Sequence, residues 1–153
     1  MRNFIGSLLH LNDPTLPIGG YTHSNGLETY VQQSLVKDTE TAALFVHNML
    51  VNNIQYNDAA FVRLAYEATK NEDIETLLLL DDECAALKTA REIRQASQKL
   101  GLRLIKVFKR QQSSVIIETY QQAIASKIAE GHYCIVYGVY AALLNIPIYE
   151  ALY

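Results

Sequence analysis

The segment 131–148, GHYCIVYGVYAALLNIPI, constrains the fold most because it carries no formal charge over its whole length. At helical spacing its apolar residues occupy both faces, and a helix that is apolar all round is buried. A transmembrane helix needs about 20 predominantly apolar residues, but His132, Asn145 and Pro147 interrupt this run. We therefore expect the central helix of a bundle and no membrane span.

Apolar residues also recur at helical spacing through most of the chain after residue 38. The first stripe consists of Ala42, Phe45, Val46, Met49, Leu50 and Ile54, and further stripes follow within 61–68, 77–87, 93–108 and 117–128. Asp38 is well placed as an N-cap, and Asn57-Asp58 interrupts the pattern. No stretch alternates as strands joined by hairpin turns do. The 153 residues fit one domain, so we expect an all-α, single-domain bundle of about seven helices over 1–153.

The segment LPIGGYTHSNGLE (16–28) combines proline and glycine with polar side chains. Pro14 and Pro17 hold two φ angles near −65° and favour extended backbone before them, which ends the first helix. Gly19 and Gly20 permit a positive φ or a close backbone approach. We expect a rigid connector here, named the opening loop below.

The second half of the opening loop prepares a helix that begins at about Gly26. Ser24 or Thr22 is placed to cap that helix, and Glu28 lies near its positive end. Exposed polar groups on a rigid loop also leave room for a recognition surface.

Two kinds of catalytic site are excluded by the residues around this loop. The run from Thr22 to Gly26 lacks the first glycine of G-x-S-x-G, and the two prolines before it exclude the preceding central strand. Gly19-Gly20 is not followed by the lysine of a phosphate-binding P-loop. The residues of this loop therefore predict neither a serine hydrolase nor a nucleotide-hydrolysing site.

Histidine and cysteine spacing favours neither a metal site nor a disulfide. The four histidines are isolated, with no His-x-x-x-His pair and no Cys-x-x-Cys motif. A site made by His23 with Glu28 stays an alternative, but we assign no metal ligand and expect no cofactor. Cys84 and Cys134 are expected to behave as small buried apolar residues.

The segment 88–110 is strongly basic, with eight Lys or Arg residues and one acid, Glu92. It therefore carries +7, and because the whole chain carries −3, the remainder carries −10. Lys99, Arg103, Lys106 and Arg110 share one helical face. A solvated outer face, a docking surface for an acidic partner and a nucleic-acid site are three interpretations of this face.

Two runs of residues resemble one protein family. LLHLNDPTLPIGGYTHSNGLETYV is similar to the N-terminal signature of the urease accessory protein F (UreF) family, LLQLxDSxLPxGxFxHSxGLE, with Tyr21 where phenylalanine is usual. Glu92-x-Arg94-x-Ala96-Ser97-x-x-x-Gly101 is similar to the family's E-x-R-x-A-S-x-x-x-G. Family members continue for several tens of residues, so the resemblance implies that the family's C-terminal helices and tail are missing.

The resemblance implies an all-helical, cytoplasmic, non-enzymatic chaperone that forms a homodimer. Family members bridge accessory protein D, also called H, to the GTPase accessory protein G for nickel insertion into apo-urease. The resemblance implies no nucleic-acid or membrane partner. A direct nickel-binding carrier and a helical nucleic-acid-binding regulatory domain stay as alternatives.

The resemblance also assigns roles to particular residues. The expected partner contacts, or residues that support them, are His23, Ser24, Glu28, Glu92, Arg94 and Ser97. The residues expected to shape the backbone are Pro17, Gly19, Gly20 and Gly26 in the opening loop, and Gly101, which would allow a close helix crossing.

Overall fold

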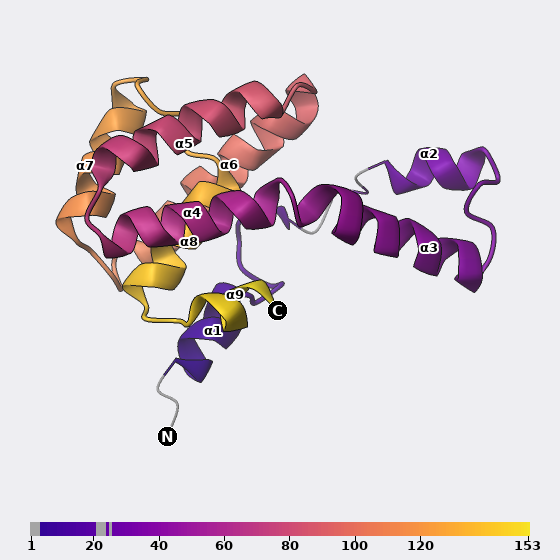
Figure 1. The fold of residues 1–153 in the computed structure, drawn as a ribbon, viewed down its shortest axis with the longest axis horizontal. Coiled ribbons are helices and arrows are strands. Elements are labelled where there is room, and N and C mark those ends of the chain that lie inside the picture. The colour runs from indigo at the N-terminus through magenta and orange to yellow at the C-terminus, as the bar shows by residue number, and fades with distance from the viewer. Residues whose placement is uncertain (1–3, 21–23, 25) are drawn as a thin grey trace.

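The chain is helical throughout in a computed structural model, which describes residues 4–20, 24 and 26–153 (Figure 1). These residues form no strand, so the all-α prediction is confirmed, with nine α-helices rather than about seven. They are α1 (Ile5–Leu11), α2 (Leu27–Gln32), α3 (Thr39–Met49), α4 (Asp58–Lys70), α5 (Ile74–Leu87), α6 (Arg91–Phe108), α7 (Val115–Ala125), α8 (Tyr133–Leu143) and α9 (Ile148–Leu152). A π-helical segment, Leu50–Ile54, joins α3 to α4.

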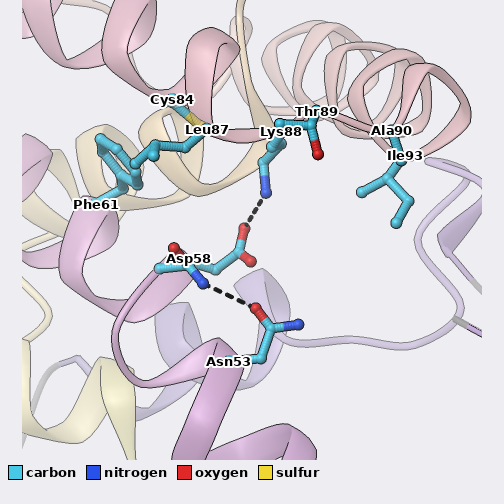
Figure 2. A pocket seen from close by; sticks show the side chains of 10 residues that line it. Asn53, Asp58, Phe61, Cys84, Leu87, Lys88, Thr89, Ala90 and Ile93 are labelled. Carbon is cyan, nitrogen blue, oxygen red and sulfur yellow. Dashed lines mark hydrogen bonds and ion pairs between the residues drawn. The ribbon is translucent and has the colours of Figure 1, made fainter.

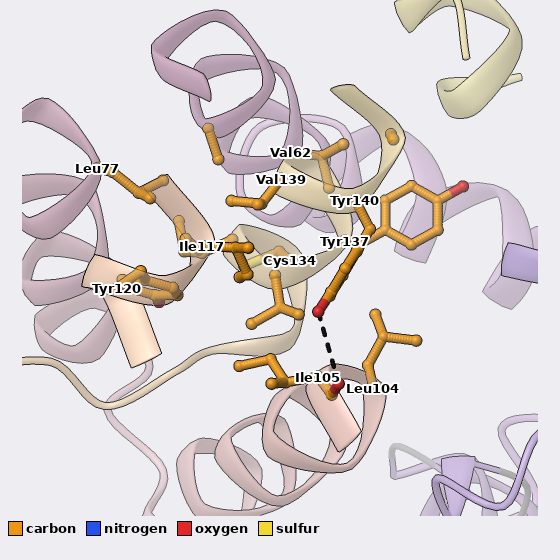
Figure 3. Packing of buried hydrophobic residues seen from close by; sticks show 14 of the residues in the cluster. Val62, Leu77, Leu104, Ile105, Ile117, Tyr120, Cys134, Tyr137, Val139 and Tyr140 are labelled. Carbon is orange, nitrogen blue, oxygen red and sulfur yellow. Dashed lines mark hydrogen bonds between the residues drawn. The ribbon is translucent and has the colours of Figure 1, made fainter. Parts of the chain in front are cut away.

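Helix α8 is the buried centre of the fold, as the uncharged segment predicted. Every residue from Cys134 to Ala142 is buried. Helices α4 and α6 make the most extensive packing against α8, and Figure 3 shows Tyr137, Val139 and Tyr140 among apolar side chains of the surrounding helices. Among the described residues, no helix combines the length and apolar character needed to cross a membrane.

The closest contact between α4 and α8 depends on Gly138. A Cβ added at Gly138 would collide with the carbonyl oxygen of Val62 and would lie 3.0 Å from the Cβ of Ala65. The two helix backbones therefore approach more closely than any side chain at this position allows.

A buried carboxylate of α5 joins that helix to α7 and to the segment before α8. Asp81 of α5, which is 1% exposed, accepts a 2.6 Å hydrogen bond from the Tyr120 hydroxyl of α7. It also accepts from the backbone N–H groups of Glu130, Gly131 and His132, immediately before α8. N–H groups at the start of a helix have no carbonyl partner within that helix. Because Asp81 accepts from the N–H groups just before α8, it sets the position at which α8 begins.

Helices α2 and α3 project from the other helices as an arm (Figure 1). Asp38 caps α3 through a reciprocal capping box with Thr41, as the sequence predicted. The rings of Tyr30 and Phe45 hold α2 against α3, with centroids 5.2 Å apart. Helix α3 nevertheless contains no buried residue, and the predicted apolar stripe is about half exposed at Val46 and Leu50.

The two cysteines lie in the core between α5 and α8. Both are free and buried, as expected, and their sulfur atoms are 3.5 Å apart. The hydrogen bond to Cys84, together with burial, raises the pKa of the Cys134 thiol far above its ordinary value. The Cys134 thiol therefore stays protonated, and the two side chains pack as apolar groups.

Replacing Gly138 with alanine is expected to destabilise the protein by about 1–3 kcal/mol, because the added methyl group forces α4 and α8 apart. Gly6→Ala is the matched control, since a Cβ at Gly6 meets nothing within 4 Å. Urea unfolding followed by circular dichroism measures both variants. Equal midpoints for the two variants would contradict this account of the α4–α8 contact.

Candidate functional site

A groove of about 540 Å³ lies between the opening loop and α6. It brings together residues of both runs that resemble the UreF family, although 60 residues separate these runs in the sequence. The opening loop and α2 contribute Gly20, Ser24, Gly26 and Glu28, and α6 contributes Glu92, Ile93, Ala96, Ser97 and Leu100. Asp58, Lys88 and Tyr133 complete the lining.

The opening loop is held against α6 by Arg103. The guanidinium Nη1 of Arg103 donates a 3.0 Å hydrogen bond to the carbonyl oxygen of Ile18. The next residue, Gly19, has a φ of +83°, and a Cβ there would collide with the same guanidinium. A Cβ at Gly20 would lie 3.8 Å from Leu100. The glycine pair thus lets the backbone run close over α6, and Pro17 precedes it at an exposed position.

The start of α2 differs from the expectation for Ser24. Gly26 is the N-cap, with a φ of +92° and no side-chain cap, and the carbonyl oxygen of Ser24 accepts from the N–H of Leu27 at 3.0 Å. The prediction that the Ser24 side chain caps α2 is therefore wrong, because a left-handed glycine makes the turn instead. Thr22 and His23 lie outside the described residues.

Charge in the groove is mostly negative and lies near its rim. Glu28 and Glu92 are exposed, whereas Lys88 forms an ion pair with Asp58 at 2.8 Å. Burial is the largest influence on the pKa of Lys88 and lowers it, but the hydrogen bond to Asp58 and the attraction of the Asp58 charge together outweigh burial and raise the lysine pKa. Two carboxylates at the rim are thus left without a cation within the groove.

The Lys88–Asp58 pair lines the groove and also a smaller pocket of about 170 Å³, which Figure 2 shows. This pocket is lined by the ends of α4 and α5, with Phe61 and Cys84 among its residues. The pair therefore ties the start of α4 to the end of α5 at the wall that the two hollows share.

Arg94 and Ser97 support the groove from behind. Arg94 is half-buried and donates to the carbonyl oxygen of Lys88 at 3.4 Å. Ser97 is buried, and its hydroxyl oxygen accepts from the N–H of Tyr133 at 3.2 Å. Of the three α6 residues expected to contact or support partners, Glu92, Arg94 and Ser97, only Glu92 has an exposed side chain.

Gly101 lies one helical turn beyond Ser97, where α6 meets the segment before α8. A Cβ at Gly101 would collide with the carbonyl oxygen of Gly131 and would lie 3.0 Å from the carbonyl carbon of His132. Helix α6 thus packs directly on backbone, which brings Ser97 within reach of His132 and Tyr133.

His132 is a structural residue that the sequence analysis did not single out. It is fully buried, its Nδ1 lies 3.2 Å from the Ser97 hydroxyl and its Nε2 lies 3.2 Å from a carboxylate oxygen of Glu130. Burial lowers the pKa of His132, and the carboxylates of Asp81 and Glu130 offset this only in part. No motif around His132 in the sequence indicated these partners.

Metal coordination finds no support in the described part of the chain. Within residues 4–20, 24 and 26–153, no group of three or more His, Cys, Asp or Glu side chains is arranged to hold an ion. The alternative site made by His23 with Glu28 involves a residue outside these ranges.

A family sequence model and individual known proteins both match this chain, and all of them carry the same family name. The sequence model of one family, described as UreF, matches residues 36–153. A urease accessory protein UreF of Actinobacillus pleuropneumoniae serotype 5b (strain L20) is 47% identical over 149 residues, which cover 97% of this chain and 66% of the relative. The UreF of Haemophilus influenzae (strain PittEE) is 44% identical over 97% of this chain and 63% of the relative.

A less similar relative has the same name and a similar coverage. The UreF of Lachnoclostridium phytofermentans (strain ATCC 700394 / DSM 18823 / ISDg) is 35% identical over 96% of this chain and 64% of its own length. The chain therefore spans just under two thirds of the length of the curated relatives that it matches.

Acidification is expected to destabilise the fold through His132. Its pKa in the folded state lies below the unfolded value of about 6.5. Below that pH the unfolded chain binds a proton that the folded chain does not, so the free energy of unfolding falls, by at most about 1.4 kcal/mol per pH unit. Urea unfolding across this range, for the wild type and for His132→Gln, measures the effect.

The glutamine variant keeps polar atoms near Ser97 and Glu130 but does not titrate. It retains the other three histidines, so the difference between the two pH profiles isolates His132. Parallel profiles would show that His132 does not couple protonation to folding.

Proposed function

This chain belongs to the UreF family, and we propose that it acts as a non-enzymatic chaperone in urease maturation. In this proposal it bridges accessory protein D/H and the GTPase accessory protein G, and the resulting complex inserts nickel into apo-urease. Nickel is the cargo of the complex. The proposal also includes a cytoplasmic location and a homodimer.

The groove between the opening loop and α6 is the observation that carries this proposal. Its wall combines apolar side chains, Ile93, Ala96 and Leu100, with carboxylates at the rim. An apolar centre with a polar rim is the usual composition of a protein–protein contact. A groove of this kind suits the side chains of a partner protein.

Different groove residues have different roles in the proposal. Glu28 and Glu92 are exposed at the rim and contact the partner directly. Ser97, Gly101 and Arg103 act through other groups, because they hold α6 on the segment before α8 and hold the opening loop on α6. Arg94 supports the turn at Lys88.

The arm supports association with a further protein surface. Val46 and Leu50 of the predicted apolar stripe are each half exposed or more, and exposed contiguous apolar surface marks protein–protein interaction sites. The homodimer in the proposal would cover such a surface.

The groove is tested by a pull-down with accessory protein D/H, with and without protein G, from this chain and from a full-length family member as reference. Glu28→Ala combined with Glu92→Ala is expected to reduce retention of D/H at least about fivefold, because both rim carboxylates contact the partner. The matched control is Asp82→Ala with Glu83→Ala, which removes two exposed carboxylates of α5 outside the groove.

Each other result has a definite meaning. Unchanged binding by the groove variant would place the contact elsewhere on the chain. Binding by the full-length reference alone would place the contact in the third of the relatives that this chain does not span. A stoichiometric nickel site that is lost in His23→Ala would favour the direct carrier instead of the bridge.

A further inference from the structure

We propose that the basic face of α6 is a second docking surface, separate from the groove, and that it binds an acidic segment of a partner protein. This face, named the basic stripe, consists of Lys99, Arg103 and Lys106 on α6, together with Lys109 and Arg110 immediately after the helix. All five side chains are exposed.

The stripe lies on the outer side of a helix whose inner side is firmly packed. Leu104, Ile105 and Phe108 are buried in the core, and the backbone at Gly101 rests against Gly131. Lys99 and Lys106 lie about 10 Å apart along the axis, at 1.5 Å per residue. The backbone that carries the stripe is therefore fixed, so binding of a partner does not require this helix to become ordered.

These cations are not neutralised by carboxylates of the same chain. Among the described residues, the ion pairs involve Arg63, Lys88 and His132, and none involves a residue of the stripe. Arg103 makes one hydrogen bond to the carbonyl oxygen of Ile18 and keeps further N–H donors in its planar fork. A row of five cations that forms no ion pair within the described part of the chain repels itself, and a carboxylate-bearing partner relieves that repulsion.

Stabilisation of the helix end explains only part of the stripe. Cations in the last turn favour a helix through its dipole, an effect that is confined to that turn. Lys106, Lys109 and Arg110 lie at or beyond the last turn, whereas Lys99 and Arg103 lie before it, in the middle of α6. Their alignment with the terminal cations lengthens the positive surface beyond what the helix dipole requires.

A protein segment fits the stripe better than a nucleic acid does. Sites for single-stranded nucleic acid interleave cations with aromatic side chains on which bases stack, and the stripe contains none. The rest of the chain is strongly acidic, and Glu92 continues the line of the stripe toward the acidic rim of the groove. A long polyanion would meet that negative charge, whereas a short acidic segment ends before it.

The test measures binding of this chain to a fluorescein-labelled peptide of alternating Glu and Ala, by fluorescence anisotropy. Lys99→Gln with Lys106→Gln is expected to weaken binding at least about fivefold, since two exposed ion pairs with the peptide are lost. Lys37→Gln with Lys127→Gln removes the same charge at two exposed positions outside α6 and is expected to change binding less than twofold. Raising the salt to about 1 M, where the Debye length is about 3 Å, should abolish binding.

Two further probes make the result decisive. A peptide of alternating Gln and Ala should not bind, and single-stranded DNA of equal charge should bind more weakly than the Glu peptide. Equal loss in the two lysine variants, or tighter binding of the DNA, would overturn the proposal. The groove variant Glu28→Ala/Glu92→Ala should bind the acidic peptide at least as well as the wild type, so failure of the groove and failure of the stripe are distinguishable.

Discussion

The hydrogen bonds to the Asp81 carboxylate are the interaction on which the rest of the fold depends. A buried carboxylate is costly unless several donors surround it, and here a tyrosine hydroxyl and three backbone N–H groups do so. These donors belong to α7 and to the segment before α8. One side chain of α5 therefore sets the start of the central helix and positions α7 beside it.

The position of the groove follows from that arrangement. Because the segment 130–132 is held by Asp81, its backbone offers a fixed surface on which Gly101 of α6 rests. His132 and Tyr133 then meet Ser97 at hydrogen-bond distance. Further along α6, Arg103 holds the opening loop. The groove is thus connected to the core by a continuous series of contacts, and its acidic rim lies next to the basic stripe.

Much of this fold could be predicted from residue patterns. The apolar residues of 131–148 predicted the central helix, Asp38 predicted the start of α3, and continuous periodicity across Gly101 predicted one long α6. The Ser24 cap was predicted wrongly, because a left-handed glycine can replace a polar cap without any sign in local spacing. The role of His132 could not be predicted, since its partners Ser97 and Asp81 are distant in sequence.

By itself the sequence determined the all-helical class, the buried α8 and the two runs that identify the family. These depend on spacing within a helix or on residue identity in a short segment, so they are local properties. Only the tertiary structure decided that the two runs line one groove and that Ser97 faces inward. It also decided that the apolar residues of α3 stay exposed. Such outcomes depend on which surfaces meet across long sequence separations, and hydrophobic burial is non-directional, so periodicity alone does not specify them.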